Sequence, residues 1–151
     1  MLEGTGMNSG PRRILLIEDS TADIELMQEA FAEAEGDVVL TSVRNGDEAL
    51  PHLRRSLGEG GDGRPDLIML DLNLPRRDGR EILEEIKRDA RLRLIPVVVL
   101  TTSGAEDDVL RCYSLGANCY IRKPFEYSQF RDLARSIVSF WFSFARLPGA
   151  V

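Results

Sequence analysis

The segment Leu67–Leu70, with the sequence LIML, restricts the fold of this chain more than any other feature. It is apolar at every position, which predicts a β-strand buried on both faces, as in a parallel sheet covered by helices. An acid, Asp71, follows it directly. Burying an ionised carboxylate is costly unless the group is paired or coordinates a metal. We therefore expect the rest of the chain to supply partners for Asp71.

Further apolar runs with the character of strands lie at residues 14–17, 38–43, 97–100 and 119–121. Each strand-like run is followed by a longer stretch with helical periodicity. A strict alternation of strands and helices predicts a parallel sheet with right-handed crossovers and helices on both faces. The sequence therefore predicts an α/β fold with a doubly wound parallel sheet.

The first helix shows the helical periodicity most clearly. Its apolar stripe consists of Ile24, Met27, Ala30, Phe31 and Ala34. Its acids, Asp23, Glu25, Glu29 and Glu33, are expected to face solvent. Later helices are expected at about 46–57, 79–90, 104–116 and 127–145. Candidate residues for the helix starts are Ser20 or Thr21, Asn45, Asp78, Ser103, and Tyr127 with Ser128.

Composition and charge argue against several classes of protein. The 151 residues, 43% of them hydrophobic, suit one globular domain. A net charge of -6 disfavours a nucleic-acid partner. The sequence contains neither a signal-peptide pattern nor an apolar run long enough to span a membrane. We expect a cytoplasmic protein with reduced thiols at Cys112 and Cys119, and a flexible segment at residues 1–11.

Polar residues stand at the carboxyl ends of the predicted strands. Glu18 and Asp19 follow the first, Asp71 follows the third, Thr101 follows the fourth and Lys123 follows the fifth. In such sheets, functional residues gather at this edge. Three neighbouring carboxylates repel one another unless a cation lies among them, and Mg²⁺ prefers oxygen ligands of this kind. The sequence therefore predicts a magnesium site at this edge.

A carboxylate in such a setting can act as a nucleophile towards phosphorus. Lys123 and the hydroxyl of Thr101 would then neutralise the phosphoryl oxygens, and Asn73 could offer its backbone carbonyl to the metal. Taken singly, these residues also have structural explanations. Glu18 with Asp19 could cap the first helix, Thr101 could simply end a strand, and Lys123 could be solvated before a turn. Their common location favours a shared site.

Four motifs, "LLIEDS", "LIMLDLNLPRRDG", "VVVLTTS" and "YIRKPF", occur in an order that resembles the receiver domain of two-component response regulators. The resemblance covers residues 12–145 and implies the flavodoxin-like sheet order 2-1-3-4-5. The bond between Lys123 and Pro124 is similar to one that is cis in the family, and the sequence leaves its state open. The site roles that the resemblance implies are Asp71 as phosphoacceptor, Glu18, Asp19, Asp71 and the Asn73 carbonyl as Mg²⁺ ligands, Thr101 and Tyr120 as switch residues, and Lys123 as phosphate-binding lysine.

The chain departs from the family pattern at two places. Glu18 stands where many members have Asp, so its longer side chain could reach the metal through water. The Gly-rich connection at residues 56–65 is longer than in compact receivers, and topology places it far from the acids. Neither departure removes a residue that the proposed chemistry requires.

The end of the chain carries a concentration of aromatic residues. Residues 12–147 are expected to form one receiver domain without an output domain. Leu133, Ile137, Trp141 and Phe144 would share one face of a continuous helix. This tail resembles small regulators that accompany phytochrome-type sensor histidine kinases and that often dimerise through the fourth and fifth helices. The predicted interface residues are Phe140, Trp141, Phe142 and Phe144.

The leading hypothesis is a stand-alone regulator that accepts a phosphoryl group from a histidine kinase and signals through protein contacts. It would act as an enzyme only in its own phosphorylation and dephosphorylation. One alternative is a phosphorylation-independent module with the same fold. Another is a small phosphatase with an Asp nucleophile, but such an enzyme would need a second acid where this chain has Asn73.

Overall fold

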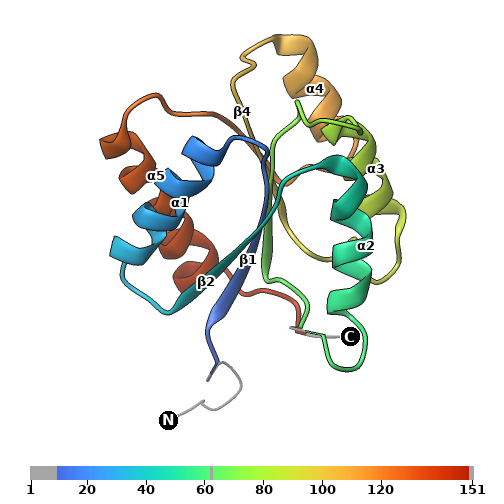
Figure 1. Cartoon of the computed structure of the whole chain (residues 1–151), viewed down its shortest axis with the longest axis horizontal. Helices are drawn as coiled ribbons and strands as arrows, with labels where there is room; N and C mark the ends of the chain where they lie inside the picture. Colours follow the sequence, from blue (N-terminus) through green and yellow to red (C-terminus); the bar gives the residue numbers. More distant parts are fainter. Residues whose placement is uncertain (1–9, 62, 150–151) are drawn as a thin grey trace.

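Five parallel strands form one sheet in the order β2-β1-β3-β4-β5 (Figure 1), which confirms the predicted order. The structure, a computed structural model, describes residues 10–61 and 63–149. Of the N-terminal segment predicted to be flexible, residues 1–9 lie outside this range. The strands are β1 (Arg12–Ile17), β2 (Val38–Val43), β3 (Leu67–Leu70), β4 (Val97–Thr101) and β5 (Cys119–Arg122).

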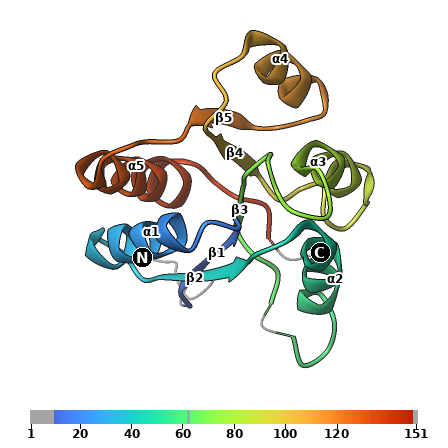
Figure 2. The same ribbon diagram turned by 45° about the horizontal axis from the view of Figure 1, so that its top comes forward.

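Helices cover both faces of the sheet, as predicted. Figure 2 shows α1 and α5 together on one face and α2, α3 and α4 on the other. Their bounds are α1 (Thr21–Glu33), α2 (Gly46–Ser56), α3 (Gly79–Arg88), α4 (Glu106–Ser114) and α5 (Tyr127–Ser139), and a π-helical segment, η1 (Phe140–Phe144), follows α5. No helix in the described part of the chain is both long and apolar enough to cross a lipid bilayer.

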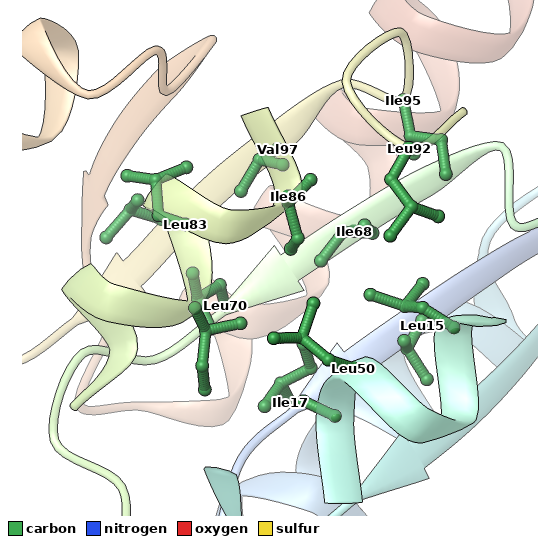
Figure 3. Close-up of a cluster of buried hydrophobic side chains, with 14 of the residues drawn as sticks. Leu15, Ile17, Leu50, Ile68, Leu70, Leu83, Ile86, Leu92, Ile95 and Val97 are labelled. Carbon is green, nitrogen blue, oxygen red and sulfur yellow. The ribbon is translucent and has the colours of Figure 1, made fainter. Parts of the chain in front are cut away.

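The central strands are buried on both faces, because their side chains alternate between two hydrophobic cores. Ile68 and Leu70 of β3 join the core beneath α2 and α3 (Figure 3). Leu67 and Met69 join the core beneath α1 and α5. All four side chains of β3 are 0% exposed, which explains why this strand is apolar at every position. Asp71 is thereby fixed at the end of a fully buried strand.

Three helix starts agree with the caps expected from the sequence. The Ser20 hydroxyl accepts a hydrogen bond from the backbone N–H of Asp23 at 3.2 Å. The Asn45 side chain accepts one from the N–H of Glu48 at 3.1 Å. Asp78 caps α3 in the same way. Each cap satisfies a backbone donor that the helix itself leaves unpaired.

Two other predicted helix starts are wrong. The N-cap of α4 is Ala105, which makes no side-chain cap bond, and not Ser103. The Ser103 hydroxyl accepts a hydrogen bond from the N–H of Ala105 at 3.3 Å, before the helix begins, and donates to the carboxylate of Asp108 in the first turn of α4 at 2.6 Å. The N-cap of α5 is Glu126, one residue before the predicted pair, because the Gln129 side chain accepts a hydrogen bond from the Glu126 N–H at 3.3 Å.

The prediction of one continuous helix to residue 145 is also wrong. The α-helix ends at Ser139, and the N–H of Ala145 donates to the carbonyl of Phe140, five residues earlier, at 2.7 Å. A π-turn contains more residues per turn than an α-helix, so it rotates the side chains that follow it. Phe144 consequently points away from the core and is 81% exposed, while Ile137 remains buried.

The chain after η1 runs back towards the connection between α2 and β3 (Figure 1). Arg64 in this connection donates to the carbonyl oxygens of Pro148 and Gly149, both at 2.9 Å. Because Arg64 precedes β3 and Asp71 follows it, this contact lies at the sheet edge opposite Asp71. The Gly-rich connection is therefore remote from the acids, as expected.

Gly79 allows the first turn of α3 to approach the segment after β3. Its N–H donates to the carbonyl of Leu72 at 2.8 Å. A Cβ atom at this position would lie 2.4 Å from the carbonyl oxygen of Asp71 and 2.6 Å from Leu72 Cα. These neighbours belong to the backbone and cannot rotate away.

We expect Gly79→Ala to destabilise the fold by about 1–3 kcal/mol, the usual cost of overpacking. Urea unfolding followed by circular dichroism measures the change. Gly58→Ala is the control, since its Cβ would meet its nearest neighbour at an ordinary 3.6 Å. Equal stability of the Gly79 variant and wild type would contradict the steric argument.

Candidate functional site

Three carboxylates meet at the carboxyl-terminal edge of the sheet. Glu18 and Asp19 follow β1, and Asp71 follows β3. One oxygen atom from each lies within 4.8 Å of the others. Glu18 and Asp71 are buried, whereas Asp19 is exposed. The cluster is therefore open to solvent on the side of Asp19.

Lys123, directly after β5, places its ammonium group among the acids. Its Nζ lies 2.7 Å from Glu18 Oε1, 2.9 Å from Asp23 Oδ2 and 3.3 Å from Asp71 Oδ2. The lysine side chain is only 8% exposed. With little water to screen them, these attractions are stronger than those of a surface ion pair. Lys123 thus links β1, α1, β3 and β5 at one point.

Burial and charge act on the ionisation of this cluster in opposite directions. Burial raises the pKa of Glu18 to about 7, and the hydrogen bond from Lys123 opposes but does not cancel that effect. Burial lowers the pKa of Lys123, but hydrogen bonds to Glu18 and Asp23 outweigh it, so the pKa is raised above its ordinary value. The lysine is therefore charged at neutral pH.

Asp23 belongs to this cluster, although the periodicity of α1 predicts that it faces solvent. The other acids of that group, Glu25, Glu29 and Glu33, are exposed as predicted. Asp23 lies in the first turn of α1, three residues after the N-cap Ser20, so it is close to the segment that carries Glu18 and Asp19. Its contact with Lys123, 100 residues away, leaves no signal in the periodicity of the helix.

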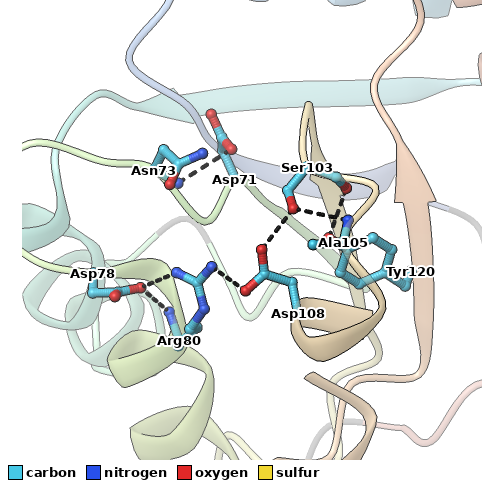
Figure 4. Close-up of polar contacts among 8 residues, drawn as sticks. All are labelled: Asp71, Asn73, Asp78, Arg80, Ser103, Ala105, Asp108 and Tyr120. Carbon is cyan, nitrogen blue, oxygen red and sulfur yellow. Dashed lines mark hydrogen bonds and ion pairs between the residues drawn. The ribbon is translucent and has the colours of Figure 1, made fainter. Parts of the chain in front are cut away.

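Asn73 follows Asp71 by two residues, and Thr101 ends β4, the strand that pairs with β3. The backbone N–H of Asn73 donates to Asp71 Oδ1 at 3.3 Å (Figure 4). The Thr101 hydroxyl is buried and has no hydrogen-bond partner among the described residues. A buried polar group without a partner is costly and unusual in folded proteins. The Thr101 hydroxyl is thus available to bind an oxygen atom of a ligand.

Tyr120 of β5 is half-buried beside the loop that follows β4. Its hydroxyl donates to the carbonyl oxygen of Ser103 at 2.8 Å (Figure 4). No cis peptide bond occurs within the described residues, so the bond between Lys123 and Pro124, whose state the sequence left open, is trans.

A hard divalent cation suits this donor set. The site offers carboxylate oxygens on one side and open solvent on the other, and Mg²⁺ characteristically keeps several water ligands. The carboxylates lie close enough for one ion to neutralise them together. The Thr101 hydroxyl, which has no hydrogen-bond partner among the described residues, is free to donate to an oxygen atom of a further ligand.

The four aromatic residues predicted as an interface divide into two groups. Trp141 and Phe142 are half-buried and pack against the core beneath α1 and α5. Phe140 and Phe144 are 55% and 81% exposed. The second pair is therefore the more exposed of the two.

Comparison with known proteins decides the family. Residues 14–135 match the response regulator receiver domain. The chain belongs to this family. Response regulator Rcp1 of Synechocystis sp. is 45% identical over 140 residues, which cover 93% of this chain and 95% of Rcp1.

Two solved structures extend this likeness to three dimensions. The phosphorylated cyanobacterial phytochrome response regulator RcpA is 49% identical, has a TM-score of 0.86, and is matched over 93% of this chain and 100% of RcpA. The Mn²⁺-bound form of Rcp1 is 46% identical with a TM-score of 0.82, over 92% of this chain and 100% of Rcp1. The family match favours a signalling receiver over the alternative of an Asp-nucleophile phosphatase.

Removing the lysine ammonium should strongly destabilise this receiver domain. We expect Lys123→Met to lower the free energy of unfolding by about 3–5 kcal/mol at neutral pH, because buried carboxylates would lose their cation. Arg135→Met, which removes a 62% exposed cation on α5, is the control and should change stability by less than about 0.5 kcal/mol. Denaturant titration measures the free energy of unfolding of both variants. A similar decrease in the two would show that Lys123 does not organise the cluster.

Proposed function

We propose that residues 12–147 act as a phosphoacceptor unit in which Asp71 receives a phosphoryl group from a sensor histidine kinase. The arrangement around Asp71 supports this proposal more than any other observation. Its carboxylate is held by Lys123 and by the Asn73 N–H, beside the unpartnered hydroxyl of Thr101. The site thus combines a fixed nucleophile with donors for the oxygens of a phosphoryl group.

We propose Mg²⁺ as the metal, held by Glu18, Asp19, Asp71 and the backbone carbonyl of Asn73. The ion would neutralise the negative charge of the carboxylates and of the incoming phosphoryl group. The Mn²⁺-bound structure of Rcp1 supports a divalent cation in a relative of this chain. The three clustered carboxylates support one here.

In the proposed reaction, a carboxylate oxygen of Asp71 forms a bond to phosphorus while the bond from phosphorus to the donor nitrogen breaks. The departing imidazole keeps the electron pair of the broken bond and takes up a proton. Lys123 already contacts Asp71 and would bind one phosphoryl oxygen. The Thr101 hydroxyl would donate to another. Transfer from small donors and hydrolysis of the product would be the chain's own catalytic activities.

We propose a phytochrome-type histidine kinase as the donor. RcpA, which shares 49% of its aligned residues with this chain, is a cyanobacterial phytochrome response regulator. Such a kinase would transfer its phosphoryl group in the cytoplasm. The net charge of -6 argues against nucleic acid as the next partner, so we propose that the signal passes to another protein.

Intact-protein mass spectrometry after incubation with acetyl phosphate tests the acceptor role. We expect one phosphoryl adduct on wild type in Mg²⁺, and none after chelation of the metal or in Asp71→Asn. Asp47→Asn, which alters an acid that is 54% exposed on α2, should still form the adduct. If wild type stays unmodified while a known receiver is labelled alongside it, the phosphorylation-independent module becomes the better explanation.

We further propose that the receiver forms a homodimer through α4, α5 and the aromatic tail. Large apolar side chains are exposed on these elements: Leu110 and Tyr113 on α4, Phe125 before α5, and Phe140 and Phe144 in η1. Exposed apolar groups of this size often mark a contact with another protein. A second copy would remove them from water.

Sedimentation velocity measures this association. We expect Phe144→Ser to weaken dimerisation by tenfold or more, since a buried aromatic ring contributes on the order of 1.5–3 kcal/mol. Leu94→Ser changes a 43% exposed residue in the connection before β4 and should leave association unchanged. A monomeric wild type at high concentration would refute the dimer.

A further inference from the structure

Helix α4 is fixed to the rest of the domain by few apolar contacts. Cys112 is its only buried residue. Its N-cap, Ala105, makes no side-chain hydrogen bond, so the first turn lacks the usual cap. A helix with so little buried surface needs other contacts to hold its position.

A pair of charged side chains supplies such a contact at the start of α4. Asp108 Oδ1 accepts a hydrogen bond from Arg80 Nη2 at 2.5 Å. Arg80 lies in the first turn of α3, and its Nη1 donates to Asp78 Oδ1 at 3.0 Å. Figure 4 shows this pair. Both of its side chains are largely buried, with exposures of 19% and 24%. The guanidinium therefore joins the starts of two neighbouring helices.

The second oxygen of Asp108 connects this pair to the loop after β4. Asp108 Oδ2 accepts a hydrogen bond from the Ser103 hydroxyl at 2.6 Å. The Ser103 carbonyl accepts from the Tyr120 hydroxyl at 2.8 Å. The loop is thus held by α4 and α3 on one side and by β5 on the other. The hydrogen bonds from Ser103 and Arg80 lower the pKa of Asp108, which keeps it ionised in these contacts.

Thr101 stands two residues before Ser103, and its buried hydroxyl has no partner within the described chain. Thr101 ends β4, where its carbonyl accepts from the N–H of Lys123 at 2.7 Å, so the contacts of Ser103 fix the loop that begins directly after Thr101. Tyr120 is engaged by the same loop. The structure thus shows a loop conformation in which the Tyr120 hydroxyl is satisfied and the Thr101 hydroxyl is left for a ligand.

We propose that Arg80 and Asp108 are positioning residues that hold the β4–α4 loop in the conformation that receives the phosphoryl group on Asp71. Neither residue contacts Asp71, so both act through Ser103 and Thr101. The inference rests on the proposed phosphoacceptor function and adds a regulatory connection to it. Groups that stabilise the receptive conformation raise the affinity for the phosphoryl group, and by linkage the bound group strengthens their own contact.

Binding of beryllium trifluoride, a phosphoryl analogue, in the presence of Mg²⁺ tests this inference. We expect Arg80→Gln and Asp108→Asn each to raise the Kd for the analogue by about fivefold or more. The double variant should be no worse than the more affected single variant, because both substitutions break the same contact. The Kd for Mg²⁺ alone should stay unchanged, since the carboxylate cluster is intact.

Two further variants separate positioning from general stability. Arg88→Gln removes a 77% exposed arginine from the same helix, where it pairs with Glu84, and should not alter binding. Ser103→Ala leaves the Arg80–Asp108 pair in place but cuts its connection to the loop. It should therefore weaken binding of the analogue, and it remains informative if removal of either charged residue prevents folding.

The outcomes distinguish the possible failures. Wild type that binds no analogue would refute the phosphoacceptor function itself. Wild-type binding together with unchanged Kd values in the Arg80, Asp108 and Ser103 variants would overturn the positioning role. That result, combined with lower unfolding stability of the variants, would show that the pair only attaches α4.

Discussion

The carboxyl-terminal edge of the sheet depends on the ion pairs that the ammonium group of Lys123 makes with the acids around it. The ammonium group lies within hydrogen-bonding distance of acids that follow β1 and β3 and of an acid on α1. Without a cation, buried carboxylates this close would repel one another and resist ionisation. The lysine therefore allows Asp71 to remain at the end of an apolar strand. The cluster that it organises also leaves one side open, where Asp19 faces solvent.

The helices on the two faces of the sheet are held in place to different degrees. On one face, α1 and α5 contribute many buried residues to a single core. On the other, α2 and α3 are similarly buried, but α4 contributes only Cys112. Helices that bury little apolar surface are the ones that can move at low energetic cost. The polar contacts that Arg80 and Ser103 make with Asp108 therefore carry much of the attachment of α4.

Much of this architecture could be predicted from the sequence, because burial leaves a strong pattern. The uniform apolarity of Leu67–Leu70 indicated a central strand. Asp71 directly after it indicated an acid that is paired or bound to a metal at the end of that strand. The caps at Ser20, Asn45 and Asp78 were also predictable from side-chain type. The sheet order, by contrast, came from family resemblance and not from any residue pattern.

The errors concern residues whose role is set by contacts that residue type and periodicity do not reveal. Asp23 looked solvent-facing because the periodicity of α1 does not reveal Lys123, which lies 100 residues away. Ser103 had the chemistry of a cap, but the carboxylate of Asp108 uses its hydroxyl. The π-turn at the end of α5 has no signature in residue type. The missing information was a contact between distant segments for Asp23, a side-chain hydrogen bond within the loop and first turn of α4 for Ser103, and a backbone hydrogen bond for the π-turn.

The contact of Arg64 with Pro148 and Gly149 has a practical consequence. It holds the last described residues at the edge of the sheet that is opposite Asp71. An affinity handle or a surface linkage attached beyond Gly149 would therefore emerge on the far side of the molecule from the acids. A protein immobilised in this way would present its acidic edge to the solution, where a large donor protein can approach it.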